Sequence, residues 1–511
     1  MLLQFLLYAF VIIILVLLVV IYYKLIYRQK QLYNAFRVQG VPGETFVPLL
    51  GQLPDIGQYV KNSEVLIYFE ELTKKHGNNF LIGYGPLTRL VCAEPDLLAD
   101  VLSRSNASKY AKPSDFTAVF LPLVGRHSLL VLEGDEHERA RRMINPAFYH
   151  TNLKSMISII IDRTTKTIES IELDDQNPKS INLQVLFNSL TLSIIASSAF
   201  GADLETNTHA KDIMCRIYTE MLDVTEYRSM RLVNQIPFLS RLPFWRKNIL
   251  DAGIAKVTEF LDEIISDRRQ GKSSSMCPGA DLLDLLLSAT DDEGQSFTDQ
   301  EIKEESLTFV LAGSETTGNL MVWMLYVLMT HDDVLRACRE EVDRVLSNGT
   351  ELSDENLSDL VVCEAVINET LRLYPPVPLF VRQCTHEHTI GTKSQLCIPE
   401  GAVVLINSYS LHRRSDLWPR PLEFDYTRWI RDPKTGHKPK LPHPFAYLPF
   451  ASGPRSCVGQ NFALLEAKIM LAMFMKRCNF EMVPGQKIIR DIKITMRTKY
   501  GLWANVSKRQ T

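Results

Sequence analysis

One stretch of this sequence combines residue types that could hold a metal through sulfur. Residues 450–459 read FASGPRSCVG, with Cys457 between Gly453 and Gly459. Glycines let the backbone approach closely and turn tightly, so backbone N–H groups can point at the sulfur. Such donors keep a thiolate deprotonated, and a thiolate ligand pushes electron density onto a haem iron, which favours O–O cleavage. Cys457 is therefore a candidate axial ligand of a haem iron.

Two neighbouring side chains support this interpretation of Cys457. The guanidinium of Arg455 is a fixed cation suited to a haem propionate, and the ring of Phe450 can pack beside the sulfur. A helical pattern follows over 461–476, so the positive end of a helix dipole would point at the thiolate. The alternative is a buried structural cysteine. Against it, five specified residues at this spacing match by chance in about one of ten thousand chains of this length.

A second motif, AGSETT, begins at Ala312 within an apolar helical pattern over 298–330 that opens with a capping box. Ala312 and Gly313 are small and would leave room for dioxygen above an iron. On the same helical stripe, Thr316 could donate a hydrogen bond to that oxygen. Glu315 lies about 100° round the helix and could relay protons from solvent. A tight helix–helix contact through the small residues is the alternative.

Both motifs resemble those of one protein family. The pattern FxxGxRxCxG around Cys457 resembles the haem-binding signature of cytochromes P450, and AGSET resembles the (A/G)Gx(D/E)T motif of the same family. The resemblance extends over roughly residues 1–505. It implies a cytochrome P450 fold that binds haem b (iron protoporphyrin IX), with Ala312 beside the cofactor. It also implies that Thr316 and Glu315 serve oxygen activation.

An acid and an arginine lie one helical turn apart at Glu369 and Arg372, in a helical pattern that ends at Pro375. The ExxR spacing alone is a weak signal, because it occurs at three other places in the chain. The family resemblance implies a buried network of these two residues with Arg428, in the segment PLEFDYTRW. Tyr426 stands in this segment where the family usually has proline.

The resemblance implies three further haem contacts. His137 and Arg141 lie one helical turn apart, where many family members carry a Trp or His followed by an Arg, both of which face a propionate. Arg382 follows a Pro-Pro pair and matches another propionate arginine. A surface cation or a helix cap is the alternative for each. The apolar runs 116–124 and 377–381 resemble family segments that line the substrate pocket, although core segments have the same composition.

The rest of the chain must position these groups. Most of it repeats apolar residues at spacings of three and four, while residues 80–84 and 88–92 read as a β-hairpin. The predicted fold class is therefore mainly α with small β-sheets (α+β). Residues 269–280 form a polar loop between two helices. No linker divides the soluble part, so we expect one haem-thiolate catalytic domain over residues 46–511.

The N-terminus has the composition of a membrane anchor. Residues 1–23 carry no charge and are long enough to span the hydrocarbon layer as a helix. A cleaved signal peptide would need a basic start, a shorter apolar core and a small-residue cleavage site. Residues 24–45 form a basic linker with Pro and Gly, and its cations place the following chain in the cytosol. We expect a single-pass protein that, by resemblance, lies in the endoplasmic reticulum membrane.

The overall composition argues against a nucleic-acid-binding protein and against a secreted protein held together by disulfides. The net charge is −3 and the isoelectric point about 6.4, so no nucleic-acid partner is indicated. The nine cysteines are odd in number and contain no CxxC pair. This pattern favours reduced thiols over a secreted disulfide framework.

By resemblance, the expected activity is that of a monooxygenase. It would use O2 and two electrons to insert one oxygen atom into a lipophilic substrate, such as a fatty acid, sterol or xenobiotic. A separate NADPH-cytochrome reductase would supply the electrons, because no flavin or nicotinamide domain is evident. One alternative is a haem-thiolate isomerase or lyase that acts on a peroxide, against which the Glu315–Thr316 pair argues. The other is a non-catalytic haem sensor.

Overall fold

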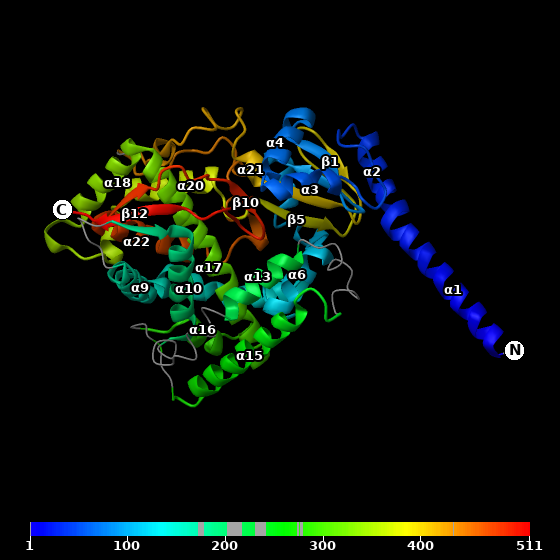
Figure 1. The fold of residues 1–511 in the computed structure, drawn as a ribbon, viewed down its shortest axis with the longest axis horizontal. Coiled ribbons are helices and arrows are strands. Elements are labelled where there is room, and N and C mark those ends of the chain that lie inside the picture. The colour runs from blue at the N-terminus through cyan, green and yellow to red at the C-terminus, as the bar shows by residue number, and fades with distance from the viewer. Residues whose placement is uncertain are drawn as a thin grey trace.

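The computed structural model describes residues 2–171, 178–201, 217–229, 242–272, 275, 279–432 and 434–510. Most of these residues lie in helices, and the sheets are small, so the predicted mainly α class is confirmed (Figure 1). The seven described cysteines are free thiols. Cys215, Cys277 and part of the predicted loop 269–280 lie outside the described residues.

Helices of very different length form the frame. They are α1 (Leu2–Tyr22), α2 (Arg28–Val38), α3 (Leu53–Asn62), α4 (Val65–His76), α5 (Pro95–Val101), α6 (Ser114–Val124), α7 (Gly134–Ile144), α8 (His150–Leu153), α9 (Ile157–Ser170), α10 (Leu183–Phe200), α13 (Tyr218–Ser229), α15 (Lys247–Arg269), α16 (Leu282–Ser288), α17 (Asp299–Thr330), α18 (Asp332–Val345), α19 (Asp354–Leu357), α20 (Val361–Leu373), α21 (Ser408–Leu411) and α22 (Gln460–Arg477). Short 3-10 turns include Tyr426–Trp429 and Gly453–Arg455.

The largest sheet has five strands in the order β1-β2-β8-β5-β3, formed by Asn79–Tyr84, Leu87–Cys92, Val403–Asn407, Leu379–Cys384 and Tyr110–Ala111. β1 and β2 are the predicted hairpin, paired from Asn79 with Cys92 to Tyr84 with Leu87. β2 and β8 are parallel, and the other neighbours are antiparallel. A second sheet joins β4 (Lys179–Asn182), β12 (Trp503–Lys508) and β9 (Cys478–Met482). Two further pairs are β6 (His388–Ile390) with β7 (Leu396–Ile398), and β10 (Arg490–Ile492) with β11 (Met496–Thr498).

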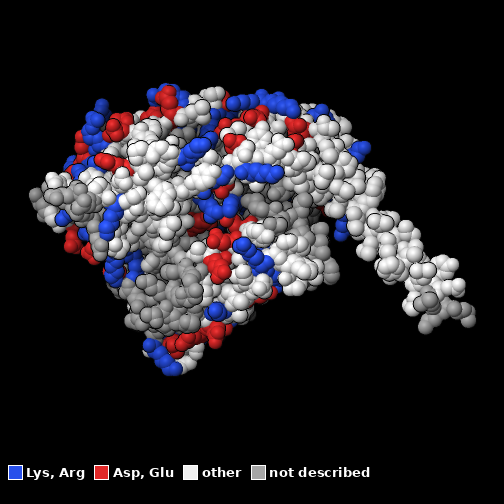
Figure 2. Space-filling view, in the orientation of Figure 1, with Lys and Arg blue, Asp and Glu red and all other residues white. Residues whose placement is uncertain are grey.

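The N-terminal helix projects away from the rest of the protein. α1 continues through a π-helical turn, Tyr23–Tyr27, into α2, and α2 contacts strand β2 of the large sheet (Figure 1). Two described helical stretches are long and apolar enough to cross a membrane, Gln4–Val38 and α10. α10 is mostly buried in the core, whereas the most apolar part of the first stretch is exposed, and Figure 2 shows no charge along most of it. The exposed helix is compatible with a membrane anchor.

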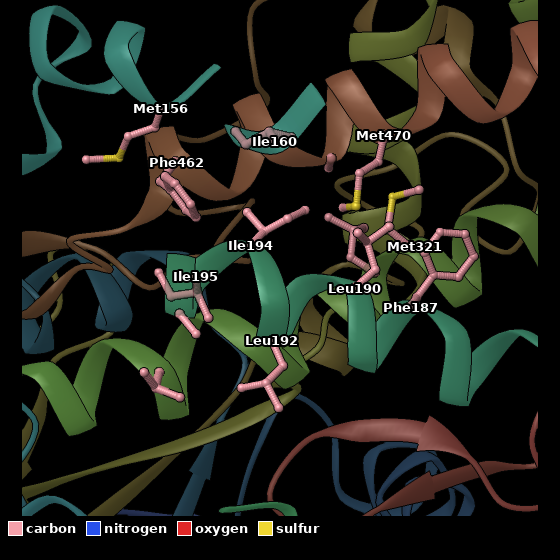
Figure 3. Close-up of a cluster of buried hydrophobic side chains, with 14 of the residues drawn as sticks. Met156, Ile160, Phe187, Leu190, Leu192, Ile194, Ile195, Met321, Phe462 and Met470 are labelled. Carbon is pink, nitrogen blue, oxygen red and sulfur yellow. The ribbon is translucent and has the colours of Figure 1, made fainter. Parts of the chain in front are cut away.

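Three long helices, α10, α17 and α22, pack together with α9 in the core. α10 packs along α17 on one side and against α9 on the other, and α22 contacts both α9 and α17. Figure 3 shows Phe187, Leu190 and Ile194 of α10 in one buried cluster with Met321 of α17 and Met470 of α22. Burial of each such side chain contributes about 1.5–3 kcal/mol, which makes this cluster a rigid base for whatever α17 and α22 carry.

The start of α17 and its glycine both have a local physical cause. Thr298 accepts a hydrogen bond from the Glu301 N–H, and the Glu301 carboxylate accepts one in return from the Thr298 N–H, as the predicted capping box requires. A Cβ atom on Gly313 would lie 2.8 Å from Ile195 of α10. Gly313 is therefore needed for the close contact of α10 with α17. This is the tight helix–helix contact that the sequence allows as the alternative role of the small residues.

Candidate functional site

A cavity of about 320 Å³ lies between α17 and the loop that precedes α22. Cys457, Gly459, Phe450 and Arg455 line it on the loop side, while Ala312 and Thr316 line it on the α17 side. These are the two motifs that the sequence analysis singled out, 141 residues apart from Thr316 to Cys457. The fold thus brings them to opposite walls of one space.

The loop wall is shaped by short backbone hydrogen bonds. The N–H of Cys457 donates to the carbonyl of Phe450 at 2.9 Å, and Gly453–Arg455 forms a 3-10 turn between them. Gly453 has a left-handed φ of 74°, and a Cβ atom there would overlap the carbonyl oxygen of Leu102. Gly453 therefore serves the packing of the loop against α5 and does not line the cavity.

The sulfur of Cys457 is open to the cavity although protein surrounds it closely. Burial raises the pKa of the Cys457 thiol, while a hydrogen bond from the Gly459 N–H and the charge of Arg141 act to lower it. α22 begins at Gln460, directly after Gly459, so the first turn of that helix adds positive dipole charge near the sulfur. This is a site where a thiolate becomes stable once a metal ion shares its charge.

The opposite wall carries the hydroxyl of Thr316, which donates a 2.6 Å hydrogen bond to the carbonyl of Ala312 one turn earlier. Glu315 does not line this cavity. It faces a smaller polar hollow of about 80 Å³, which it shares with Glu226 of α13 and Arg497 of β11. Glu226 binds Arg497 at 2.9 Å, and burial raises the pKa of the Glu226 carboxyl. Glu315 and Thr316, which are neighbours in the sequence, therefore face different spaces: Glu315 the polar hollow and Thr316 the cavity of Cys457.

A cluster of cations lies at one side of the cavity. Lys112, Arg382 and Arg455 line it, and His137 and Arg141 lie close behind them. Burial, followed by the charges of Arg455 and Arg382, lowers the pKa of Lys112 to about 7. Burial and Arg455 lower the pKa of Arg382 to about 10. Burial and the same cations lower the pKa of His137 to about 3, so its imidazole is neutral.

Among the residues that the structure describes, one acid forms an ion pair with this cluster. Glu133 pairs with Arg455, whereas the ammonium of Lys112 reaches the carbonyls of Leu129 and Leu130. Buried cations of this kind are normally paired. A planar group with two carboxylates and a central metal, as in haem, would supply the missing anions beside the cations and a metal ion beside Cys457. The donor set present therefore fits a haem.

Lys112 was not identified from the sequence, because nothing near it along the chain marks it as a ligand. It reaches the cavity only because β3 pairs with β5, which carries Arg382, and so brings residue 112 beside that arginine.

His137 and Arg141, the other two predicted haem contacts, do not line the cavity as Lys112, Arg382 and Arg455 do. The Arg141 guanidinium donates to the carbonyl of Ser456 at 2.6 Å and so supports the Cys457 loop.

The predicted acid–arginine network is assembled around Glu369, which is fully buried. Arg372 donates two hydrogen bonds to its carboxylate, at 2.7 and 2.9 Å. Arg428 lies 3.3 Å from the same carboxylate, and the indole N–H of Trp429 and the backbone N–H of Asp425 complete the set at 2.7 and 3.0 Å. The sequence did not identify the contribution of Trp429. Tyr426 lies at the start of the 3-10 turn, Tyr426–Trp429, so the absence of proline leaves that turn intact.

His412 connects this network to the loop of Cys457. Its Nε2 accepts a hydrogen bond from the Leu448 N–H at 2.8 Å, so Nδ1 carries the proton and donates to the carbonyl of Arg372 at 3.1 Å. Burial, Arg413 and Arg372 lower the pKa of His412 to about 3, which keeps this neutral form. Because Leu448 and Phe450 line the cavity, the network determines the position of one cavity wall.

Comparisons with known proteins agree with this geometry. The family model described as Cytochrome P450 matches residues 41–502. Cytochrome P450 4F12 of Homo sapiens is 28% identical over 474 residues, covering 89% of this chain and 86% of that protein. Cytochrome P450 709B1 of Arabidopsis thaliana is 29% identical over 506 residues, covering 94% and 93%. The crystal structure of the cytochrome P450DA heme domain superposes with a TM-score of 0.77 at 24% identity, covering 92% of this chain and 98% of that one.

The structural likeness establishes the fold, and the family match extends over most of the chain. The family match and the cavity that places Cys457 opposite Ala312 and Thr316 together account for both sequence motifs. This chain belongs to the cytochrome P450 family and is a haem-thiolate monooxygenase.

Proposed function

We propose that this chain inserts one oxygen atom of O2 into a lipophilic substrate, a fatty acid, sterol or xenobiotic, with electrons from a separate NADPH-cytochrome reductase. The observation that carries the proposal is the cavity in which the open sulfur of Cys457 faces Ala312 and Thr316. Phe116, Phe380 and other apolar side chains line the remaining wall, which favours a substrate with little charge.

The cofactor in this proposal is haem b. Cys457 would bind its iron through sulfur, Phe450 and Gly459 would contact the cofactor, and Lys112, Arg382 and Arg455 would hold its propionates. His137 and Arg141 would support them from behind. When bound, the haem would supply the chemistry of O2 activation and oxygen transfer. The network of Glu369, Arg372 and Arg428 would keep the loop wall in place.

The protein's own part in the reaction is to hold the substrate and to deliver protons. The hydroxyl of Thr316 projects into the cavity, so it can turn from the Ala312 carbonyl to donate a hydrogen bond to oxygen. Glu315 would accept protons from the polar hollow on the other side of α17 and pass them along the helix to Thr316. The apolar wall would keep bulk water from the reacting atoms.

The exposed N-terminal helix supports a single-pass arrangement. We propose that residues 1–23 form the transmembrane anchor, residues 24–45 the basic linker and residues 46–511 the catalytic domain on the cytosolic side of the endoplasmic reticulum membrane. The absence of charge over the first 23 residues, followed by Lys24, Arg28 and Lys30, supports this orientation.

Purified full-length protein tests the proposal directly. Reduction under carbon monoxide should give the red-shifted Soret band of a thiolate ligand, and the Cys457→Ala variant should lose that band. Cys397→Ala, which removes another free thiol, should keep it. A wild-type protein without the band would refute the haem-thiolate assignment.

The same preparation separates the rival activities. The proposed activity requires NADPH and added reductase and consumes O2 with the substrate. Turnover of a lipid peroxide without electrons would indicate an isomerase or lyase, and haem binding without substrate-dependent O2 consumption would indicate a sensor. Either result would contradict the proposal.

A further inference from the structure

A second cavity, of about 280 Å³, adjoins the haem site, and Phe116 and Phe380 line both. We call it the antechamber. Side chains of α3, α4, α6, the large sheet and the 492–494 segment form its walls, which are predominantly apolar. α3 and β1 lie in the part of the domain from which α2 and the anchor helix leave (Figure 1). Val60, which is 41% exposed, lies at its rim, so an apolar molecule can reach it from outside.

One ion pair is built into this apolar wall. Arg89 of β2 donates to Asp115 in the first turn of α6 at 2.5 Å, and both side chains are largely buried, at 12% and 15% exposure. The guanidinium lies 4.6 Å over the ring of Tyr84, which also lines the antechamber. The remaining cation of the wall, Lys493, is held by Glu226 at 3.3 Å.

The pair still has unused hydrogen-bonding capacity. Among the described hydrogen bonds, the Nη1 group of Arg89 has no acceptor, and unlike Nε it is not enclosed by protein. Asp115 accepts from Arg89 through one oxygen, and the dipole of α6 also favours its negative charge. The antechamber therefore presents a free donor beside a carboxylate acceptor, with no net charge between them.

This arrangement discriminates between polar groups on a lipophile. A hydroxyl has one donor and two acceptor lone pairs, so it can accept from Arg89 and donate to Asp115 at once. A carboxylate has no proton to donate and would bring a second negative charge within a few ångströms of Asp115, in surroundings that screen it poorly. It could accept a hydrogen bond from Arg89 only while its charge is repelled by that of Asp115.

Resting on the proposed function, we infer that the substrate is an uncharged, hydroxyl-bearing lipophile. Its polar end is held in the antechamber by Arg89 and Asp115, and its apolar body passes Phe116 and Phe380 into the haem cavity. Oxidation then falls on the part of the molecule remote from the hydroxyl. Within the proposed substrate classes, this favours long-chain alcohols and sterols over free fatty acids.

The test compares two probes of equal length, 1-dodecanol and dodecanoate, on the full-length holoprotein. Binding is followed by the spin-state shift of the ferric haem. We expect the wild type to bind the alcohol at least about tenfold more tightly than the carboxylate, on the order expected for one uncompensated like charge at short range. Tighter binding of the carboxylate, equal binding of the two, or no shift with either would overturn the inference.

Asp115→Asn provides the second measurement, because it leaves Arg89 without its acid. The preference should move toward the carboxylate by at least about tenfold. Asp135→Asn, at an exposed position of α7, is the matched control and should leave the ratio unchanged. If Asp115→Asn does not fold, the wild-type ratio alone decides. Loss of the carbon monoxide band in the wild type would refute the proposed function, whereas an intact band with the opposite preference would refute only this inference.

Discussion

Replacing Glu369 with alanine would leave the guanidinium of Arg372 buried without a counter-ion. Breaking a buried pair from one side usually destabilises a protein by about 3–5 kcal/mol. Arg372 keeps the carbonyls of His412, Pro421 and Glu423 as acceptors, which places its own loss near the lower limit. The N–H groups that also bind Glu369 would each lose an acceptor, at about 1 kcal/mol or more. The expected loss is therefore about 5 kcal/mol.

A loss of this size is comparable with the whole free energy of unfolding of many proteins, about 5–15 kcal/mol. We expect Glu369→Ala to lose its haem, because His412 and Leu448 connect the network to the wall that holds Cys457. The measurements are the haem content per protein and the guanidinium unfolding curve of the purified variant.

Glu364→Ala is the matched control, on the same helix α20. Glu364 binds Lys468, Lys438 and Arg431, and the two more exposed cations, Arg431 and Lys438, can return to water when the acid is removed. We expect a smaller loss, of about 1–3 kcal/mol, and full haem content for this variant. If Glu369→Ala keeps its haem and unfolds within about 1 kcal/mol of Glu364→Ala, the network does not support the haem site and our reasoning is wrong.

Three further results are expected. Thr316→Val should keep the carbon monoxide band but form less product per NADPH consumed, because the hydroxyl that donates toward oxygen is absent; unchanged coupling would contradict its role. The haem affinity of the wild type, divided by that of Lys112→Met, should be constant below pH 7 and fall by up to tenfold per pH unit above it. The reason is that the apoprotein amine, with a pKa of about 7, must regain a proton before it can pair with a propionate. If titrations of apoprotein with haem give a ratio that does not depend on pH, Lys112 does not bind a propionate. Gly453→Ala should destabilise the fold by several kcal/mol more than Gly436→Ala in chemical unfolding, because both have a left-handed φ but only Gly453 faces the carbonyl of Leu102.

The sequence was sufficient for features that are local in the chain. The capping box at Thr298, the hairpin of β1 and β2, and the tight loop before Cys457 all depend on residues within 13 positions of one another. The fold class followed from periodicity for the same reason. Family resemblance then related these local features to a common cavity.

Features that depend on contacts distant in the chain could not be read in this way. Lys112 reaches the cavity through the pairing of β3 with β5, and His412 acts through Arg372 and Leu448. A glycine in a motif also has no single meaning in a sequence. Gly453 meets Leu102, and Gly313 meets Ile195, so both are required by packing against other elements.

The separation of Glu315 from the haem cavity by α17 has a consequence for how such an enzyme can diversify. Under the proposed roles, protons enter through the hollow beside Glu226, while the molecule to be oxidised enters past Phe116 and Phe380. Phe116 and Phe380 do not line the hollow, so mutations at these two positions leave the first route unchanged. A related enzyme could therefore change its substrate specificity at these positions while it keeps the residues that deliver protons for oxygen activation.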